Sequence, residues 1–335
     1  MISADEYQAY GTTLINFAEK ISSFSSPLAV GMSGNFRQMK RRILNIAVFR
    51  KETLYQKMRA LIIYLVISAV FIGCTPILSI DASTQNVYHF SDTDKNISLL
   101  DISETFGTYD GSFVLYDNNL DSWKIYDLEE ATKRIPPEST YKIYDALLGL
   151  ESGIITPEHS SMTWNGDAFP FPSWEADQDL NSAMQNSVNW YFQAIDSQLG
   201  INRVQEFLNK IEYGNQTTSS NLDLYWSDFS LKISPLEQVT LLKKFNTNEF
   251  HLNFQNVFSV KNAIKIASTP NGNFYGKTGT GRVNGQDING WFIGYVETSD
   301  NSYYFATNIQ SDSNATGKKA FEITSDILKK LHIWN

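Results

Sequence analysis

The longest hydrophobic segment of the chain covers residues 60–80 and reads ALIIYLVISAVFIGCTPILSI. Its 21 residues carry no charge, and about 20 apolar residues are enough to cross a bilayer as a helix. The pattern therefore predicts one transmembrane helix over residues 59–81. Cys74 leaves two interpretations open, because it is either a lipidated cysteine after Phe71-Ile72-Gly73 or an apolar residue of the membrane helix.

Charge differs on the two sides of this segment. Residues 1–59 carry nine Lys/Arg and four Asp/Glu, whereas residues 82–335 carry 18 basic and 31 acidic residues. Basic residues beside a membrane helix mark its cytoplasmic side. We therefore expect a single-pass protein of the cell membrane, with residues 1–58 in the cytoplasm, a linker over 82–98 and an extracellular domain over 99–335.

Short strand patterns and helical patterns share the segment after residue 99. Apolar alternation or short apolar runs predict strands at 112–116, 123–126, 274–278, 290–296 and 303–308. Helical spacing predicts helices at 139–150, 181–199, 203–210, 234–245, 257–267 and 318–331. The turn residues Asp117-Asn118-Asn119 join the first two strands as a hairpin. This order predicts an α+β fold, in which an antiparallel sheet is packed by helices.

Composition excludes several classes of protein. The chain has 335 residues, of which 42% are hydrophobic and 19% charged, so it can build a sizeable core. A single cysteine excludes a disulfide framework. The net charge of −9 argues against a nucleic-acid partner. The four histidines are scattered and no HExxH motif is present, so we expect no metal site.

Two short motifs indicate acyl-transfer chemistry. Ser139 and Lys142 are three residues apart, so on a helix their side chains share one face. A serine hydroxyl becomes a nucleophile when a base takes its proton, and a desolvated lysine can be that base. Lys277-Thr278-Gly279 lies on a predicted strand, where a lysine and a threonine can bind a substrate carboxylate. Each motif alone is common, but S-x-x-K and K-T-G in this order form a recognised set.

With these motifs and several others, the chain resembles the penicillin-recognising serine family, and within it the class D β-lactamase branch. The resemblance covers about residues 100–332. Its further motifs are PPESTYK, WEADQDLNSAMQNSVNWYFQ, the triplet Tyr213-Gly214-Asn215, Trp226, YGKTGTG and GWFIGYVE. The triplet itself has two readings, as a family motif or as a simple turn.

The N-terminal part narrows the resemblance. NFAEKISSFSSPLAVGMSGNFRQMKRRILNIAVFRK, followed by a membrane helix, is similar to the end of the metallopeptidase module of BlaR/MecR-type β-lactam sensor-transducers. In that family an HExxH peptidase precedes an extracellular class D-like penicillin sensor. The resemblance implies that residues 1–58 are a remnant of such a module. It also implies β-lactam antibiotics as ligands and a separate peptidase or a repressor as a partner.

The resemblance assigns a role to each motif residue. Ser139 would be acylated and Lys142 would be its base, as an amine or as a carbamate formed with CO₂. Ser187 would relay a proton to the β-lactam nitrogen. Lys277, Thr278 and, in a looser alignment, Lys318 would bind the substrate carboxylate. Trp226 would contact the carbamate, and the backbone N–H groups of Ser139 and Thr280 would form the oxyanion hole.

Asn189 separates two functions within the family. Class D hydrolases usually carry a hydrophobic residue at this position, whereas the sensors carry asparagine. An amide oxygen beside Lys142 would stabilise its ammonium form and remove the base that activates water for deacylation. We therefore expect a sensor with a long-lived acyl-serine. The alternatives are a membrane-tethered class D β-lactamase and a cell-wall transpeptidase or carboxypeptidase.

Overall fold

The computed structural model describes residues 12–13, 58, 86–91 and 95–334. The transmembrane helix predicted at 59–81, and nearly all of the part predicted to be cytoplasmic, lie outside the described residues. No helix in the described part of the chain is long and apolar enough to cross a membrane. Residues 79–335 form one compact unit, which holds every predicted site residue.

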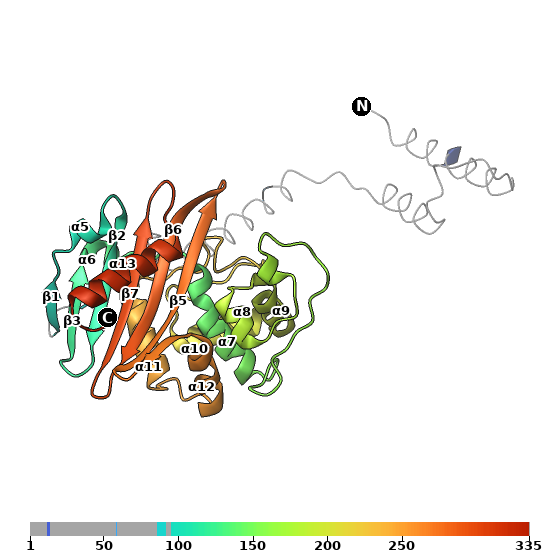
Figure 1. The fold of residues 1–335 in the computed structure, drawn as a ribbon. Coiled ribbons are helices and arrows are strands. Elements are labelled where there is room, and N and C mark those ends of the chain that lie inside the picture. The colour runs from blue at the N-terminus through green and yellow to red at the C-terminus, as the bar shows by residue number, and fades with distance from the viewer. Residues whose placement is uncertain (1–11, 14–57, 59–85, 92–94, 335) are drawn as a thin grey trace. The chain divides into compact units, whose positions relative to one another are not determined.

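A seven-stranded sheet is the frame of the described domain, in the order β1-β3-β2-β7-β6-β5-β4 (Figure 1). The strands are β1 (Asn96–Leu99), β2 (Asp110–Asp117), β3 (Ser122–Tyr126), β4 (Lys265–Thr269), β5 (Gly272–Val283), β6 (Gln286–Glu297) and β7 (Ser302–Gln310). Neighbouring strands are antiparallel, except that β1 runs parallel to β3. The predicted antiparallel sheet is thus confirmed for β2–β7, and β1 makes the whole sheet mixed.

Helices cover both faces of this sheet. The helices are α5 (Ser103–Phe106), α6 (Leu128–Thr132), α7 (Lys142–Glu151), α8 (Leu180–Gln185), α9 (Asn189–Leu199), α10 (Ile201–Ile211), α11 (Pro235–Asn246), α12 (Phe254–Ala263) and α13 (Gly317–Lys330), with short 3₁₀ turns η1 (Glu138–Tyr141) and η2 (Pro172–Trp174). Alternate side chains of a strand point to opposite faces. Phe113 and Leu115 of β2 therefore join the core under α13, whereas Val114 and Tyr116 join the core that contains α7 and α11.

The first part of the domain differs from the prediction. Strand β1 starts at Asn96, inside the predicted linker 82–98, and pairs along β3. The backbone N–H of Tyr88 donates to the carbonyl of Thr132 at 2.8 Å. The folded domain therefore begins before residue 99. The pattern missed β1 because this four-residue strand lies at the sheet edge and is mostly exposed, so burial leaves no periodic signal.

Two predicted helices are also altered by tertiary structure. The helix predicted at 181–199 is divided into α8 and α9, because Ser187 has a left-handed backbone with φ +54°. The helix predicted at 257–267 is α12, which ends at Ala263, and the next residues form β4 and pair with β5. The first of these differences matters for function, since it turns Ser187 away from a regular helix.

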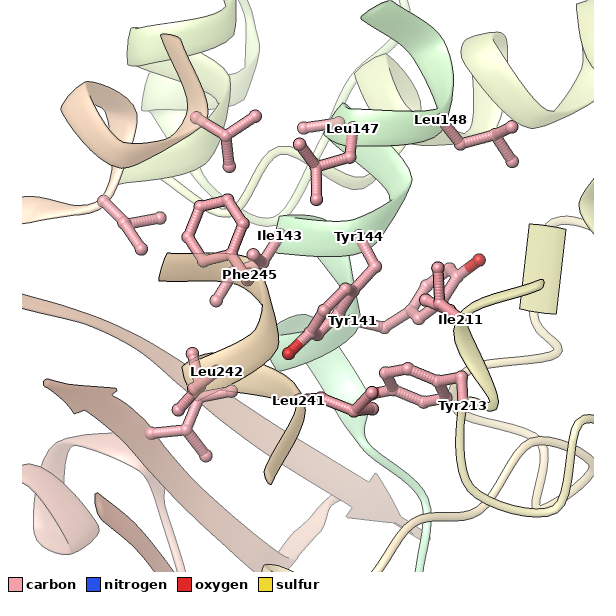
Figure 2. Close-up of a cluster of buried hydrophobic side chains, with 14 of the residues drawn as sticks. Tyr141, Ile143, Tyr144, Leu147, Leu148, Ile211, Tyr213, Leu241, Leu242 and Phe245 are labelled. Atoms are coloured by element: carbon pink, nitrogen blue, oxygen red, sulfur yellow. The ribbon is translucent and has the colours of Figure 1, made fainter. Parts of the chain in front are cut away.

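The core around α7 positions the predicted SxxK motif. Figure 2 shows the side chains of this helix between those of α11 and the segment after α10. The labelled members are Tyr141, Ile143, Tyr144, Leu147, Leu148, Ile211, Tyr213, Leu241, Leu242 and Phe245. Each of these side chains is at most 5% exposed. Close packing of this kind fixes rotamers and backbone, so α7 holds Lys142 rigidly at its N-terminus.

An ion pair with little solvent exposure links Arg134, which follows α6, to Glu237 in the first turn of α11. Arg134 donates to Glu237 through Nε at 2.9 Å and through Nη2 at 2.5 Å. Glu237 also accepts hydrogen bonds from the backbone N–H and hydroxyl of Ser234 at 3.0 and 2.8 Å, which completes the cap of α11. The side chains of Arg134 and Glu237 are 17% and 8% exposed, so water screens this ion pair only weakly.

We expect Glu237→Ala to lower the free energy of unfolding by about 2–3 kcal/mol, because it breaks a bidentate ion pair with little solvent exposure and removes a helix cap. Chemical denaturation followed by tryptophan fluorescence measures the change. Glu129→Ala is the matched control, since that carboxylate is 83% exposed in its pair with Lys133, and exposed pairs contribute less than about 1 kcal/mol. Equal losses for both variants would contradict the assignment.

Candidate active site

Ser139 lies in the 3₁₀ turn η1, directly before α7. The preceding residue, Glu138, has φ +53°, so the chain turns sharply between Pro137 and the helix. The Ser139 Oγ accepts a hydrogen bond from Lys142 Nζ at 2.9 Å. The predicted Ser–Lys pair is therefore formed, although across a junction of a 3₁₀ turn and an α-helix rather than within one regular helix.

Lys142 is buried at the centre of the site, with 1% of its surface exposed. Its Nζ donates to the side-chain oxygen of Asn189 at 2.7 Å, in addition to Ser139. The rings of Trp226 and Phe192 lie 5.5 and 5.6 Å from Nζ. Burial lowers the pKa of Lys142 to about 8, although nearby carboxyl groups oppose the shift. About one tenth of this amine is therefore neutral at pH 7, whereas almost none of an ordinary lysine is, and the neutral form is the one that a base requires.

Ser187 and Lys277 form a second pair. The break between α8 and α9 presents the Ser187 hydroxyl to Lys277 on β5, and Lys277 Nζ donates to Ser187 Oγ. The same Nζ donates to the carbonyl of Thr278 at 3.1 Å. Burial, with the positive charge of Lys142, lowers the pKa of Lys277 well below its usual range. The site thus holds two buried lysines, each of which donates a hydrogen bond to a serine hydroxyl, and the charge of Lys142 acts on Lys277.

Strand β5 approaches η1 closely at Gly279. A Cβ on this residue would lie 3.1 Å from the Pro137 carbonyl oxygen and 3.3 Å from the Ser139 nitrogen. Only glycine allows this approach without displacing the turn. The approach brings the backbone after Gly279 next to Ser139. The Thr280 hydroxyl accepts a hydrogen bond from the Gly317 N–H at 2.9 Å, which ties β5 to the start of α13.

A cavity of about 340 Å³ opens onto these residues. Its lining consists of Ser139, Phe171, Ser173, Trp174, Asn186, Ser187, Asn189, Thr278, Gly279, Thr280, Arg282 and Asp287. Five of the predicted site residues therefore line one cavity: Ser139, Ser187, Asn189, Thr278 and Thr280. Lys142, Lys277 and Trp226 lie beneath it as buried side chains.

Lys318 differs from the other predicted site residues, because it neither lines the cavity nor is buried. It is exposed at the start of α13. Arg282 lines the cavity and holds Asp287 through Nε at 2.7 Å and Nη2 at 3.2 Å. The prediction missed Arg282, because its place at the rim depends on the pairing of β5 with β6, which brings Asp287 opposite Arg282.

Glu138 is a second residue that the sequence did not single out. It is 6% exposed and accepts a hydrogen bond from Asn289 Nδ2 at 3.1 Å. Burial raises the pKa of Glu138 to about 8. A carboxyl group directly before the candidate nucleophile was the available signal, but an acidic residue at a helix start is ordinary.

The triplet Tyr213-Gly214-Asn215 is a structural turn. Gly214 has φ +53°, and a Cβ on it would lie 1.9 Å from the carbonyl oxygen of Lys232. Asn215 accepts from the Lys232 N–H at 2.9 Å and donates from Nδ2 to the Ser230 carbonyl at 2.7 Å. Of the two interpretations, the structure supports the turn, because the triplet reverses the chain after α10 and Asn215 holds it against residues 230–232.

Comparison with known proteins places this geometry among penicillin-binding proteins. The family model of the penicillin binding protein transpeptidase domain matches residues 111–329. The regulatory protein BlaR1 of Bacillus licheniformis is 42% identical over 97% of this chain and 54% of its own length. The chain thus spans about half the length of the curated relatives it matches.

Solved structures agree with this similarity. The C-terminal domain of the Bacillus licheniformis BlaR penicillin-receptor is 45% identical, with a TM-score of 0.70, and the match covers 72% of this chain and 99% of that one. The class D β-lactamase BAT-2 is 36% identical, with a TM-score of 0.66 over 70% of this chain and 97% of that one. The fold is therefore shared by a receptor and by hydrolases.

Proposed function

The chain belongs to the penicillin-binding protein transpeptidase family as a BlaR/MecR-type member, and from this membership we propose that it is a β-lactam sensor. In this proposal Ser139 captures the antibiotic as a covalent ester, and the persistence of that ester is the signal. One observation carries the proposal: Lys142 Nζ lies between the Ser139 hydroxyl at 2.9 Å and the Asn189 amide oxygen at 2.7 Å.

Acylation follows from the first of these contacts. The neutral Lys142 amine accepts the proton of Ser139, whose Oγ attacks the β-lactam carbonyl carbon. Backbone N–H groups of Ser139 and Thr280 stabilise the oxygen that gains negative charge. The C–N bond of the ring then breaks, Ser187 passes its proton to the leaving nitrogen, and Ser187 takes a proton back from the Lys277 ammonium that donates to its Oγ. The substrate carboxylate is bound by Lys277, Thr278 and, at the cavity rim, Arg282 in place of the predicted Lys318.

Persistence of the ester follows from the second contact. Ester hydrolysis needs a base that activates water, and a carbamate on Lys142 would supply that base when present. The apolar rings of Trp226 and Phe192 and the lowered pKa of the amine suit reaction with CO₂. The amide oxygen of Asn189 instead accepts a hydrogen bond from the ammonium form and favours it. The site therefore supports acylation better than turnover.

We expect Asn189→Val to shorten the lifetime of the acyl-protein by about tenfold or more, because it removes the acceptor that favours the ammonium of Lys142. Intact-mass measurement after a penicillin pulse follows the loss of the adduct. Asn186→Val is the control, since Asn186 lines the same cavity without contacting Lys142. An unchanged lifetime in Asn189→Val would refute the role of this amide.

The function itself is tested by the same measurement on the unchanged chain. After a brief pulse of benzylpenicillin, a sensor retains one penicillin mass for hours. The competing reading, a membrane-tethered class D β-lactamase, is favoured by the similarity to BAT-2. It predicts an adduct that disappears within seconds while hydrolysed product accumulates. If no adduct forms, Ser139 is not the residue that penicillin acylates.

The cellular setting is part of the proposal. The 21 uncharged residues at 60–80 and the basic residues before them support a single-pass membrane protein with its sensor outside the cell. A separate peptidase or a repressor would then receive the signal on the cytoplasmic side. Protease accessibility of the sensor in intact cells tests this orientation, since an extracellular domain is cleaved without lysis.

A further inference from the structure

Two buried carboxyl groups lie behind the candidate active site. Asp145 and Asp196 are both 0% exposed. Within the described part of the chain, none of their four carboxylate oxygens has a hydrogen bond of normal geometry, but Asp145 and Tyr225 both lie close enough to Asp196 to act on its pKa. Isolated buried charges are costly, so such a pair persists when it shares a proton or acts on a nearby charge.

Helix geometry directs this pair at Lys142. Asp145 follows Lys142 by three residues on α7, about one turn, and Asp196 follows Asn189 by seven residues on α9, about two turns. Helices α7 and α9 pack against each other. The hydrogen bond from Lys142 to Asn189 and the pair Asp145–Asp196 therefore lie at successive helical turns along the interface between α7 and α9.

The electrostatics agree with this arrangement. Burial raises the pKa of both carboxyl groups. Hydrogen bonding to Tyr225 and Asp145 and the charge of Lys142 oppose the rise in the pKa of Asp196 and favour its ionisation, and the charge of Asp196 further raises the pKa of Asp145 and keeps it protonated. Charge on either carboxyl opposes the fall in the pKa of Lys142. Two carboxyls that interact strongly lose their protons in two separate steps, so one proton remains shared after the first step.

Other titratable groups surround the pair and Lys142. They are Glu138 and Tyr141 from η1, Tyr144 from α7, Tyr213, Asp223 and Tyr225 from the segments after α10, and Lys277 from β5. The hydroxyls of the four tyrosines are buried and make no hydrogen bond of normal geometry with the described residues, although that of Tyr225 lies close to Asp196 and Tyr141. Tyr141, Tyr144 and Tyr213 are seen in the cluster of Figure 2. These hydroxyls can reorient toward a charged carboxyl without repacking the core.

We propose that Asp145 and Asp196 share one proton and, as a singly charged pair, hold Lys142 as an ammonium, which prolongs the life of the acyl-serine. The pair makes no contact with the reacting atoms, so both are positioning residues. The inference rests on the proposed sensor function and adds a second determinant of ester lifetime to Asn189. An ammonium neither reacts with CO₂ nor takes a proton from water, so the ester keeps no efficient deacylating base.

The test uses the full chain and the variant Asp145→Asn with Asp196→Asn. Both changes conserve volume, and the two amides can hydrogen-bond each other. The rate of acylation by benzylpenicillin is measured against pH by intact mass, since this profile reports ionisations of the free protein. We expect its acidic limb to move about one pH unit lower, and the ester to be lost about tenfold faster at neutral pH.

Asp117→Asn is the matched control, because Asp117 is 5% exposed but belongs to the β2–β3 turn and accepts from Asn301 at 2.8 Å. This control should keep the wild-type midpoint and ester lifetime. A double variant that remains folded and keeps the wild-type midpoint overturns the proposal.

A second measurement needs no variant and no antibiotic. With ¹³C-labelled aspartate carboxyls in the unchanged chain, NMR should show two buried groups that together retain one proton at neutral pH. Two fully ionised or two fully protonated groups at that pH would overturn the shared proton. If the unchanged chain forms no penicillin adduct, the proposed function fails. The NMR titration then tests by itself whether Asp145 and Asp196 share a proton.

Discussion

Replacement of Ser139 by alanine is expected to abolish covalent capture of benzylpenicillin, with a fall in acylation rate of more than about 10⁴-fold. The hydroxyl is the atom that forms the ester, and its Oγ is the group that Lys142 contacts at 2.9 Å. Intact mass of the chain after exposure to the antibiotic should show no added penicillin. The effect is large because no neighbouring group can form the same ester from the same position.

Ser173→Ala is the control for this loss. Ser173 lines the same cavity, but it is held through its backbone carbonyl, which accepts a hydrogen bond from Gln178 at 2.9 Å. This variant should acylate at close to the wild-type rate. If Ser139→Ala still gained one penicillin mass, another nucleophile, with Ser187 the first to test, would take its place.

Replacement of Lys142 by methionine is expected to slow acylation by about 10²–10⁴-fold, the usual contribution of a general base. Methionine keeps the apolar stem that packs between Trp226 and Phe192, so the fold should be retained. In the unchanged chain, the base is the form of Lys142 without its extra proton. Because burial lowers its pKa to about 8, acylation should decline as the pH falls below that value.

Stopped-flow or quenched acylation over a pH series measures both effects. Lys142→Met should remove the acidic limb as well as the rate, since the titrating group is gone. Lys232→Met is the control, because that lysine lies on the surface and bonds Asn86 at 2.9 Å. A variant that lost rate but kept the same acidic limb would assign the limb to another group, with Glu138 the nearest candidate.

Much of the site could be predicted from local sequence. Helical spacing put Ser139 and Lys142 on one side of a turn, and they are in contact at 2.9 Å, because a helix fixes the directions of its side chains within a few residues. Lys277 was predicted on a strand and lies on β5, where its Nζ donates to Ser187. The strands of an antiparallel sheet were likewise predicted from apolar alternation or short apolar runs, whereas their order β2-β7-β6-β5 comes from the structure.

Other features were decided by the tertiary structure alone. The segment 181–199 has a helical pattern throughout, yet the structure breaks it at Ser187 and so delivers a hydroxyl to Lys277. Arg282, rather than Lys318, reaches the cavity, because the pairing of β5 with β6 sets the rim.

Asp145 and Asp196 show the same division. Each is an ordinary polar position of a helix when its own segment is read alone, and the two lie 51 positions apart in the chain. Their burial, their mutual repulsion and their effect on Lys142 arise only when α7 packs on α9. The sequence by itself determined the motifs, the elements that carry them and the class of chemistry, since these depend on spacing along one element. Packing between elements decided which groups are desolvated together, and desolvation is what sets the charge of the lysine on which the ester's lifetime depends.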